Sequence, residues 1–286
     1  MLAEVIRVQV NGIDFRILCQ GSGEPLILLH GFTGSADSWL PIAGELARDH
    51  RMYAIDLIGH GCSAVPENSA RYAYERAVDD LPAALTGLGI DRAAWLGYSL
   101  GGRLALGVAF AHPECVSALI LESATAGIRD EDERASRRLS DEVLASRIEQ
   151  HGIEAFVAEW EALPMWVSQQ SLAPAVLAAQ RAQRLASNPL GLANSLRGMG
   201  QGAQPSLWDR LGDVRAPTLL IAGALDTKFA GIAAEMSQSI PDATHALVPR
   251  AGHAVHLESP ACFCEIVRAF LARRRAADAA RQEVVR

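Results

Sequence analysis

Short apolar runs alternate with amphipathic stretches along most of the chain. Residues 5–10 and 13–18 flank Asn11-Gly12, a pair that favours tight hairpin turns, so the chain is predicted to open with two antiparallel strands. The later runs are continuously apolar, which is typical of parallel strands buried on both faces. These runs are residues 25–29, 51–55, 92–96, 117–121, 217–222 and 245–248.

Amphipathic stretches with helical spacing lie between these runs. The alternation of strand and helix predicts an α/β fold with a mostly parallel central sheet of about eight strands and helices on both faces. The expected helices are residues 38–48, 72–88, 101–111, 231–239 and 260–275.

The alternation stops between residues 126 and 212, where no comparable apolar strand occurs. This segment is rich in Arg, Glu, Gln and Ala and is broken at Pro164, Pro174 and Pro189, which indicates a helical insertion. An insertion at this point would cover the carboxyl ends of the strands and act as a lid. A solvated helical appendage is the alternative. We therefore expect a core made of residues 1–125 and 213–286, with residues 126–212 as the lid.

The composition narrows the class of ligand. Half of the 286 residues are apolar, which suits one large domain with a full core. The net charge of −7 and a pI near 5.6 argue against nucleic acid as a partner, so an anionic ligand would need a local basic pocket. The oligomeric state is left open by these features.

Cysteine usage and the N-terminus point to a cytoplasmic protein. The N-terminus lacks the basic and apolar regions of a signal peptide, and no apolar run approaches membrane length, so no stable membrane insertion is expected. The five cysteines lack C-x-x-C spacing, which predicts free thiols in a reducing compartment and no metal site. They are Cys19, Cys62, Cys115, Cys262 and Cys264.

A candidate nucleophile follows the apolar run at residues 93–96. Gly97-Tyr98-Ser99-Leu100-Gly101 fits G-x-S-x-G, in which a strand enters a tight turn and then a helix. Glycine is needed at both ends because neighbouring backbone passes too close for a Cβ. The pattern is common by chance, so its context must support it.

A serine hydroxyl needs a histidine to take its proton and a carboxylate to orient that histidine. Asp226 and His253 each follow a predicted strand, and the chain order Ser, Asp, His is the one expected of α/β-hydrolases. We favour His253 over His256, which a helix start would point elsewhere. Capping of the next helix is the alternative role for Asp226.

The oxyanion hole is expected to use backbone amides. The stretch His30-Gly31-Phe32-Thr33-Gly34 directly follows an early strand, where the second donor belongs. The amides of Phe32 and Leu100 are the candidates. His60, in the Gly-rich turn after residue 55, is interpreted as structural.

With these residues in place, the sequence resembles the α/β-hydrolase superfamily along nearly its whole length. Within it, the chain is similar to the family of 2-succinyl-6-hydroxy-2,4-cyclohexadiene-1-carboxylate (SHCHC) synthases of menaquinone biosynthesis. The most particular matches are Arg103, four residues after the serine, and Leu196-Arg197-Gly198-Met199-Gly200. The other similar stretches are residues 29–35, 97–106, 122–124, 191–200 and 226–229.

The resemblance implies a carbon–oxygen lyase that uses hydrolase machinery. In that family the activated serine removes a proton next to the succinyl ketone of 2-succinyl-5-enolpyruvyl-6-hydroxy-3-cyclohexene-1-carboxylate, and pyruvate leaves from the far side of the ring. The developing enolate-like charge suits an oxyanion hole, and no acyl-enzyme is required. The resemblance implies a small polycarboxylate substrate and no cofactor or metal.

Several further residues match pocket positions of the family. Because the substrate carries several carboxylates, arginine forks are expected in the pocket. Solvated helix faces remain the alternative for the arginines, and core packing for the aromatic residues. The matched residues are Arg103, Arg129, either Arg181 or Arg184, Tyr98 and Trp160.

Two other functions remain open at this point. The main rival is a carboxylic-ester or carbon–carbon bond hydrolase with the same fold and triad, from which the lid residues would separate a lyase. A non-catalytic binding protein is the third hypothesis, and a complete Ser99, Asp226 and His253 set argues against it because binding needs no proton relay.

Overall fold

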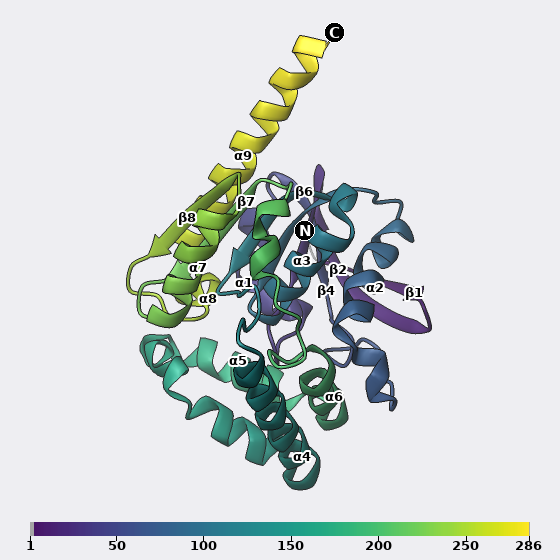
Figure 1. Ribbon diagram of the computed structural model, residues 1–286, viewed down its shortest axis with the longest axis vertical. Coiled ribbons are helices and arrows are strands. Elements are labelled where there is room, and N and C mark those ends of the chain that lie inside the picture. The colour runs from purple at the N-terminus through teal and green to yellow at the C-terminus, as the bar shows by residue number, and fades with distance from the viewer. Residues whose placement is uncertain (1–2, 286) are drawn as a thin grey trace.

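The computed structural model describes residues 3–285, and within them an eight-stranded sheet forms the centre of the molecule (Figure 1). The strand order is β1-β2-β4-β3-β5-β6-β7-β8. The pairs β1–β2 and β2–β4 are antiparallel, and the remaining neighbours are parallel, which confirms the expected fold class. The strands are β1 (Glu4–Val10), β2 (Ile13–Gly21), β3 (Glu24–Leu29), β4 (His50–Ile55), β5 (Ala93–Tyr98), β6 (Val116–Glu122), β7 (Thr218–Gly223) and β8 (Ala243–Val248).

The opening hairpin has the turn that its sequence predicts. Asn11 and Gly12 both have positive φ, 48° and 79°, and Val10 pairs with Ile13 across the turn. Two consecutive left-handed residues characterise the primed turns whose twist matches that of the strands. The Asn-Gly prediction is confirmed.

Helices cover both faces of the sheet. On one face α2 (Tyr74–Thr86), α3 (Leu100–Ala111) and α7 (Thr227–Ser239) pack through a common apolar cluster. On the other face α1 (Leu40–Leu46) and α9 (Pro260–Val285) bury a second cluster. Two expected boundaries were wrong. A 3₁₀ helix (Ala36–Trp39) precedes α1, and α7 starts before residue 231 because the Asp226 side chain caps it.

The helices of segment 126–212 form a separate layer, here called the cap. It contains α4 (Glu131–Glu161), a 3₁₀ helix (Pro164–Ser171), α5 (Pro174–Leu185) and α6 (Pro189–Met199), and Figure 1 shows these helices at one end of the molecule. Each proline expected to break the segment lies at the start of a helix, where its missing N–H costs nothing. The cap has its own small core, formed by Ala145, Ile148, Phe156, Val157, Leu192, Ala193 and Leu196.

Short helices complete the fold. They are 3₁₀ helices at Ser69–Tyr72, Pro113–Cys115 and Trp208–Asp213, and α8 (Val255–Glu258). None of the helices formed by residues 3–285 is long and apolar enough to cross a membrane.

Candidate active site

Ser99 lies at a strained turn between β5 and α3. Its φ of 51° and ψ of −107° are unfavourable for a residue with a side chain. A Cβ on Gly97 would overlap the Gly101 carbonyl oxygen, and one on Gly101 would overlap the Leu29 carbonyl oxygen. The steric reason for both glycines is confirmed. The turn holds the Ser99 side chain at the N-terminus of α3, at the carboxyl edge of the sheet.

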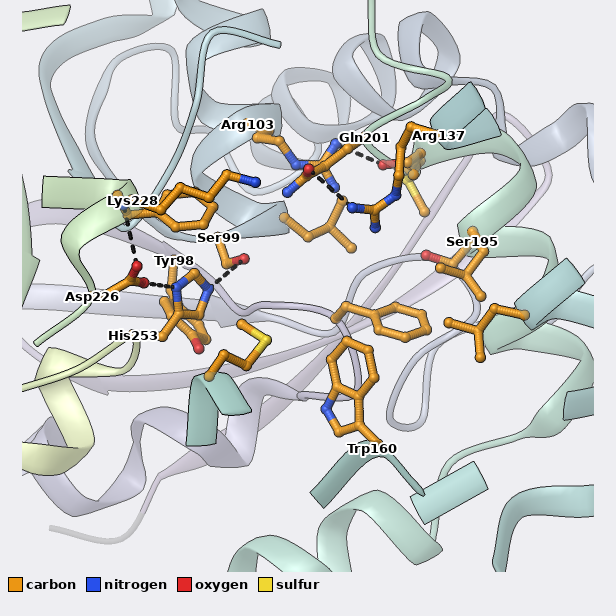
Figure 2. A pocket seen from close by; sticks show the side chains of 18 of the residues that line it. Tyr98, Ser99, Arg103, Arg137, Trp160, Ser195, Gln201, Asp226, Lys228 and His253 are labelled. Atoms are coloured by element: carbon orange, nitrogen blue, oxygen red, sulfur yellow. Dashed lines mark hydrogen bonds and ion pairs between the residues drawn. The ribbon is translucent and has the colours of Figure 1, made fainter. Parts of the chain in front are cut away.

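The structure brings Ser99, His253 and Asp226 together from three separate loops (Figure 2). His253 Nδ1 lies 2.6 Å from Asp226 Oδ2, and His253 Nε2 lies 3.2 Å from Ser99 Oγ. Only 2% of His253 is exposed. In this arrangement Nδ1–H donates to the carboxylate and Nε2 accepts from the serine hydroxyl. The histidine can therefore take the serine proton while the carboxylate fixes its ring.

Asp226 makes the contacts that both of the roles weighed for it require. Its Oδ2 binds His253, and its Oδ1 accepts the backbone N–H of Phe229 at 3.2 Å, which caps α7. Burial raises the pKa of Asp226, but the hydrogen bond and charge of His253, with the Phe229 N–H, outweigh it and leave the pKa below its ordinary value. The carboxyl group is thus ionised at neutral pH.

His256 points away from Ser99, as expected. Its Nδ1 lies 2.9 Å from both carboxylate oxygens of Glu122, and its backbone N–H donates to Glu122 Oε1 at 2.9 Å. Both residues are buried, and the Glu122 carbonyl accepts the Ser99 N–H at 2.9 Å. The pair stands directly behind the nucleophile turn. No local sequence pattern marks this pair, because its two residues are 134 positions apart.

The two expected oxyanion-hole residues flank Ser99. Phe32 and Leu100 both line the cavity that contains the triad. Leu100 is the first residue of α3, so its N–H has no acceptor within its own helix. A Cβ on Gly31 would lie 2.7 Å from the Tyr98 ring, which shows how closely the Phe32 loop approaches the turn. This arrangement is suited to binding an oxyanion with backbone amides.

A cavity of about 330 Å³ opens in front of the triad between the sheet and the cap. Of the residues that line it in the described structure, three are cationic and only Asp226 is acidic. The cations are Arg103, Arg137 and Lys228. The local charge is therefore positive in a chain whose net charge is −7.

Arg103 is buried between the cavity and the cap. Its Nη1 donates to the Met199 carbonyl at 2.8 Å and to Gln204 Oε1 at 3.2 Å. Burial, with a smaller contribution from the nearby charge of Arg137, lowers the pKa of Arg103 to about 10, so the guanidinium remains charged at neutral pH. Arg103 thus lines the cavity as expected and also anchors the chain at the end of α6.

Arg137 of α4 was missed by the sequence analysis. Its Nε donates to Asp141 Oδ1 at 2.8 Å. Its Nη1 donates to Gln201 Oε1 at 3.2 Å, as Figure 2 shows. It lies in a stretch rich in Arg and Glu, where a cavity-facing arginine has the same local pattern as a solvated one.

The structure places Arg129 and Arg181 outside this cavity, and their role in binding substrate stays a prediction. Arg129 stacks 3.7 Å from the centre of the Trp208 ring and pairs with Glu235 at 2.6 Å, on a half-exposed surface. Arg181 is half-exposed and paired with Glu161. These surface carboxylates and the Trp208 ring hold both side chains away from Ser99.

Arg184 lies next to the cavity in front of Ser99 but does not line it. It lines a neighbouring cavity of about 530 Å³ on the far side of Trp166, and its guanidinium lies 5.4 Å from that ring. It is also paired with Glu161 at 3.1 Å. The structure therefore does not place Arg184 in the cavity in front of Ser99, although Trp166 and Tyr98 line both spaces.

The aromatic candidates combine packing with contact to the cavity. Tyr98 and Trp160 both line it, and Trp160 packs 5.4 Å from Phe32 and 5.6 Å from Phe156. Within residues 3–285, Trp160 Nε1 and Ser195 Oγ are buried without a hydrogen-bond partner. Ser195 was missed because an apolar helix face with one serine carries no distinct signal.

His30 and His60 are structural histidines beneath the Phe32 loop. His30 Nε2 accepts the Leu57 N–H at 3.0 Å, and burial lowers its pKa to about 4. Burial also lowers the pKa of His60 to about 3. Both rings are neutral at neutral pH, in agreement with the interpretation of His60.

No cluster of His, Cys, Asp or Glu side chains suited to a metal ion occurs among residues 3–285. All five cysteines are free thiols.

Comparison with known proteins agrees with this geometry. Residues 24–260 match the family model described as alpha/beta hydrolase fold. A Bacillus subtilis (strain 168) protein provisionally named 2-succinyl-6-hydroxy-2,4-cyclohexadiene-1-carboxylate synthase is 44% identical over 91% of this chain and 96% of its own length. The synthase of that name from Enterobacter sp. (strain 638) is 32% identical over 85% of this chain and 91% of its own.

A solved structure points to the same group. MenH from S. aureus superposes with a TM-score of 0.87 and 32% identity, covering 91% of this chain and 98% of that one. The chain therefore belongs to the α/β-hydrolase fold family and, within it, to the family of the SHCHC synthases.

Proposed function

We propose that this protein catalyses the SHCHC synthase reaction, the elimination of pyruvate from 2-succinyl-5-enolpyruvyl-6-hydroxy-3-cyclohexene-1-carboxylate. The observation that carries the proposal is the Ser99, His253 and Asp226 relay opening onto a cavity with three cations and no carboxylate besides Asp226. Such a cavity suits a substrate with several carboxylates.

The relay would act as a base in this reaction. Ser99 Oγ takes the proton next to the succinyl ketone while His253 Nε2 takes the serine proton, and Asp226 stabilises the resulting imidazolium. The electrons of the broken C–H bond move onto the ketone oxygen, where the Phe32 and Leu100 amides would stabilise the charge. As that charge returns through the ring, the carbon–oxygen bond to the enolpyruvyl group breaks, and the released enolate takes up a proton to give pyruvate.

The cavity walls would hold the substrate in place. The buried Arg103 and the partly exposed Arg137 are the arginines that would bind its carboxylates. Trp160 Nε1 and Ser195 Oγ, buried and without partners in the described residues, are donors for its neutral oxygens. A cytoplasmic location is part of the proposal, and the free thiols support it.

Ester or carbon–carbon bond hydrolysis is the second candidate. The observation that favours it is the hydrogen bond from Ser99 Oγ to His253 Nε2, since the same contact activates serine for attack on a carbonyl. The two functions differ in their use of the serine. The lyase needs it only as a base, whereas the hydrolase forms an acyl-enzyme.

A direct assay tests the proposal. Purified protein is incubated with the cyclohexene substrate or with a simple activated ester, with Ser99→Ala as the matched control. We expect pyruvate and SHCHC in equal amounts from the first substrate and poor turnover of the ester, which lacks the carboxylates that the cations bind. Efficient ester hydrolysis without pyruvate release from the cyclohexene would assign the protein to the hydrolases.

A further inference from the structure

The basic residues of this chain are almost uniformly arginine. The sequence contains 25 arginines and one lysine, Lys228. Arginine is used even in exposed ion pairs for which lysine would serve equally well, such as Arg48 with Glu45 and Arg210 with Asp213. Lys228 is therefore the one basic position at which the chain has an ammonium group instead of a guanidinium group.

Lys228 lies at the mouth of the cavity in front of Ser99. It is the second residue of α7, two positions after Asp226, and it lines the cavity while remaining exposed to solvent. Figure 2 shows its side chain extending from the Asp226 side of the cavity in the direction of Arg103. The one lysine of the chain therefore stands beside the proposed catalytic groups.

Within residues 3–285, no hydrogen bond or ion pair holds the Lys228 ammonium, and its charge makes only a minor contribution to the lowered pKa of Asp226. The first turn of a helix carries a partial positive charge and disfavours a cation. The nearest acidic residue in sequence, Asp226, already uses its two oxygens for His253 and the Phe229 N–H. Among residues 3–285, no carboxylate forms an ion pair with Lys228, whose ammonium lies 5.8 Å from the centre of the Phe229 ring.

The two arginines of the cavity differ from Lys228 in this respect. Arg103 is held by the Met199 carbonyl and Gln204, and Arg137 by Asp141 and Gln201. Their guanidinium groups are fixed before any ligand binds. Lys228 ends in a compact charge with three rotatable donors on a flexible stem, so it can follow a carboxylate as the ligand enters and reacts.

We propose that Lys228 binds a carboxylate of the substrate at the mouth of the cavity, and that this position requires an ammonium rather than a guanidinium. The proposal rests on the function proposed above, which supplies a substrate with carboxylates on both the succinyl and the enolpyruvyl groups. Lys228 is thus a binding residue for the entering anion, whereas Arg103 and Arg137 receive the charge inside.

Steady-state kinetics give the first test. Lys228→Met should raise KM about tenfold with a smaller effect on kcat, because a partly exposed charge-assisted hydrogen bond is lost. Lys228→Arg should recover only part of that loss. Arg48→Met removes an exposed, ion-paired cation in the turn after α1, which does not line the cavity, and should leave KM unchanged. An unchanged KM in Lys228→Met, or full recovery in Lys228→Arg, would overturn the proposal.

The single lysine also allows a test that does not depend on activity. Protein labelled with [ε-¹³C]lysine should give one side-chain resonance, and its absence in Lys228→Arg assigns it. Pyruvate represents the leaving group, and 4-oxopentanoate represents the succinyl arm. We expect one of the two acids to shift the lysine resonance saturably, and its methyl ester to cause no shift. The acid that causes the shift identifies which carboxylate of the substrate Lys228 binds. No shift with either acid at concentrations that inhibit turnover would refute the proposal.

The outcomes separate the two proposals. Turnover by the wild type with an unchanged KM in Lys228→Met and no shifted resonance removes the role of Lys228 and leaves the proposed function standing. A folded wild type that shifts its lysine resonance with the acids but releases no pyruvate from the cyclohexene substrate removes the proposed function and keeps an anion site at Lys228.

Discussion

The core side and the cap side of the cavity are held in place by different means. On the core side, close backbone approach fixes the site: Ser99 sits in a strained turn whose glycines have no space for a Cβ. On the cap side, α5 has no fully buried side chain, and ion pairs and hydrogen bonds add to the small apolar core between α4 and α6. Arg197 pairs with Glu142 and Glu149, and Gln183 donates to Ser35 and Ser38. The proposed catalytic side is thus fixed by backbone packing, whereas the cap depends more on contacts between polar side chains.

The largest effect is expected from the core side. Ser99→Ala and His253→Ala should each lower kcat by at least about a hundredfold, because the proton relay is broken, while the fold is kept. Turnover is measured alongside circular dichroism and urea unfolding. Near-normal turnover in a folded Ser99→Ala protein would refute the role of the relay.

Arg103 joins the two sides, and its removal should have the next largest effect. Arg103→Ala should cost about 2 to 4 kcal/mol in kcat/KM, and Arg103→Lys should recover only part, because a point charge cannot replace a fork. Gln204→Leu removes one anchor of the same guanidinium and serves as the matched control. It should lower stability more than kcat/KM. An Arg103→Ala enzyme with normal kcat/KM would show that this arginine only anchors the cap.

Mild acid should weaken the core before it weakens the cap. His30 and His60 are neutral in the folded protein, with pKa values lowered by burial to about 4 and about 3, whereas in the unfolded chain they bind protons below pH 6.5. The unfolded state therefore holds more protons in that window. Stability should fall as pH falls from 6.5 toward 4, by about 3 kcal/mol for His30 alone.

The cap ion pairs should persist through the same window. Hydrogen bonds from Arg197 hold the pKa values of Glu142 and Glu149 below their ordinary value. These ion pairs therefore stabilise the fold at any pH above the ordinary glutamate pKa, and the stabilisation is lost only when the pH falls through the lowered pKa values. Urea unfolding between pH 7 and 4.5 measures how steeply the free energy of unfolding falls with pH. His60→Phe should make this fall less steep. An equal slope in His60→Phe would contradict this assignment.

The smallest effect is expected where α5 attaches to the core. Gln183→Ala removes two hydrogen bonds, of 2.6 and 2.7 Å, to Ser35 and Ser38. It should cost about 1 kcal/mol locally and raise KM by no more than about fivefold. Hydrogen exchange should quicken in α5 and stay unchanged in α3. Exposed Gln170→Ala is the control, and equal exchange in the two variants would show that Gln183 does not tether the helix.

The core side of the cavity could be predicted from the sequence to a greater extent than the cap side. The strands, the nucleophile turn and the chain order of Ser99, Asp226 and His253 follow from local patterns, because buried parallel strands and tight turns constrain the residue types that they contain. The cap arginines do not follow from such patterns. Arg137 faces the cavity while Arg129 and Arg181 pair with surface glutamates, and no local feature separates them. Long charged side chains reach their partners across helices, so tertiary packing decides where each one lies.

The use of Ser99 as a base tests the account most directly. Rapid-quench mass spectrometry of the intact protein during turnover of the cyclohexene substrate, with pyruvate followed in parallel, measures any covalent intermediate. The account predicts unmodified Ser99 throughout, no burst, and one pyruvate for each SHCHC formed. A covalent adduct on Ser99 that rises and decays in step with product would contradict it.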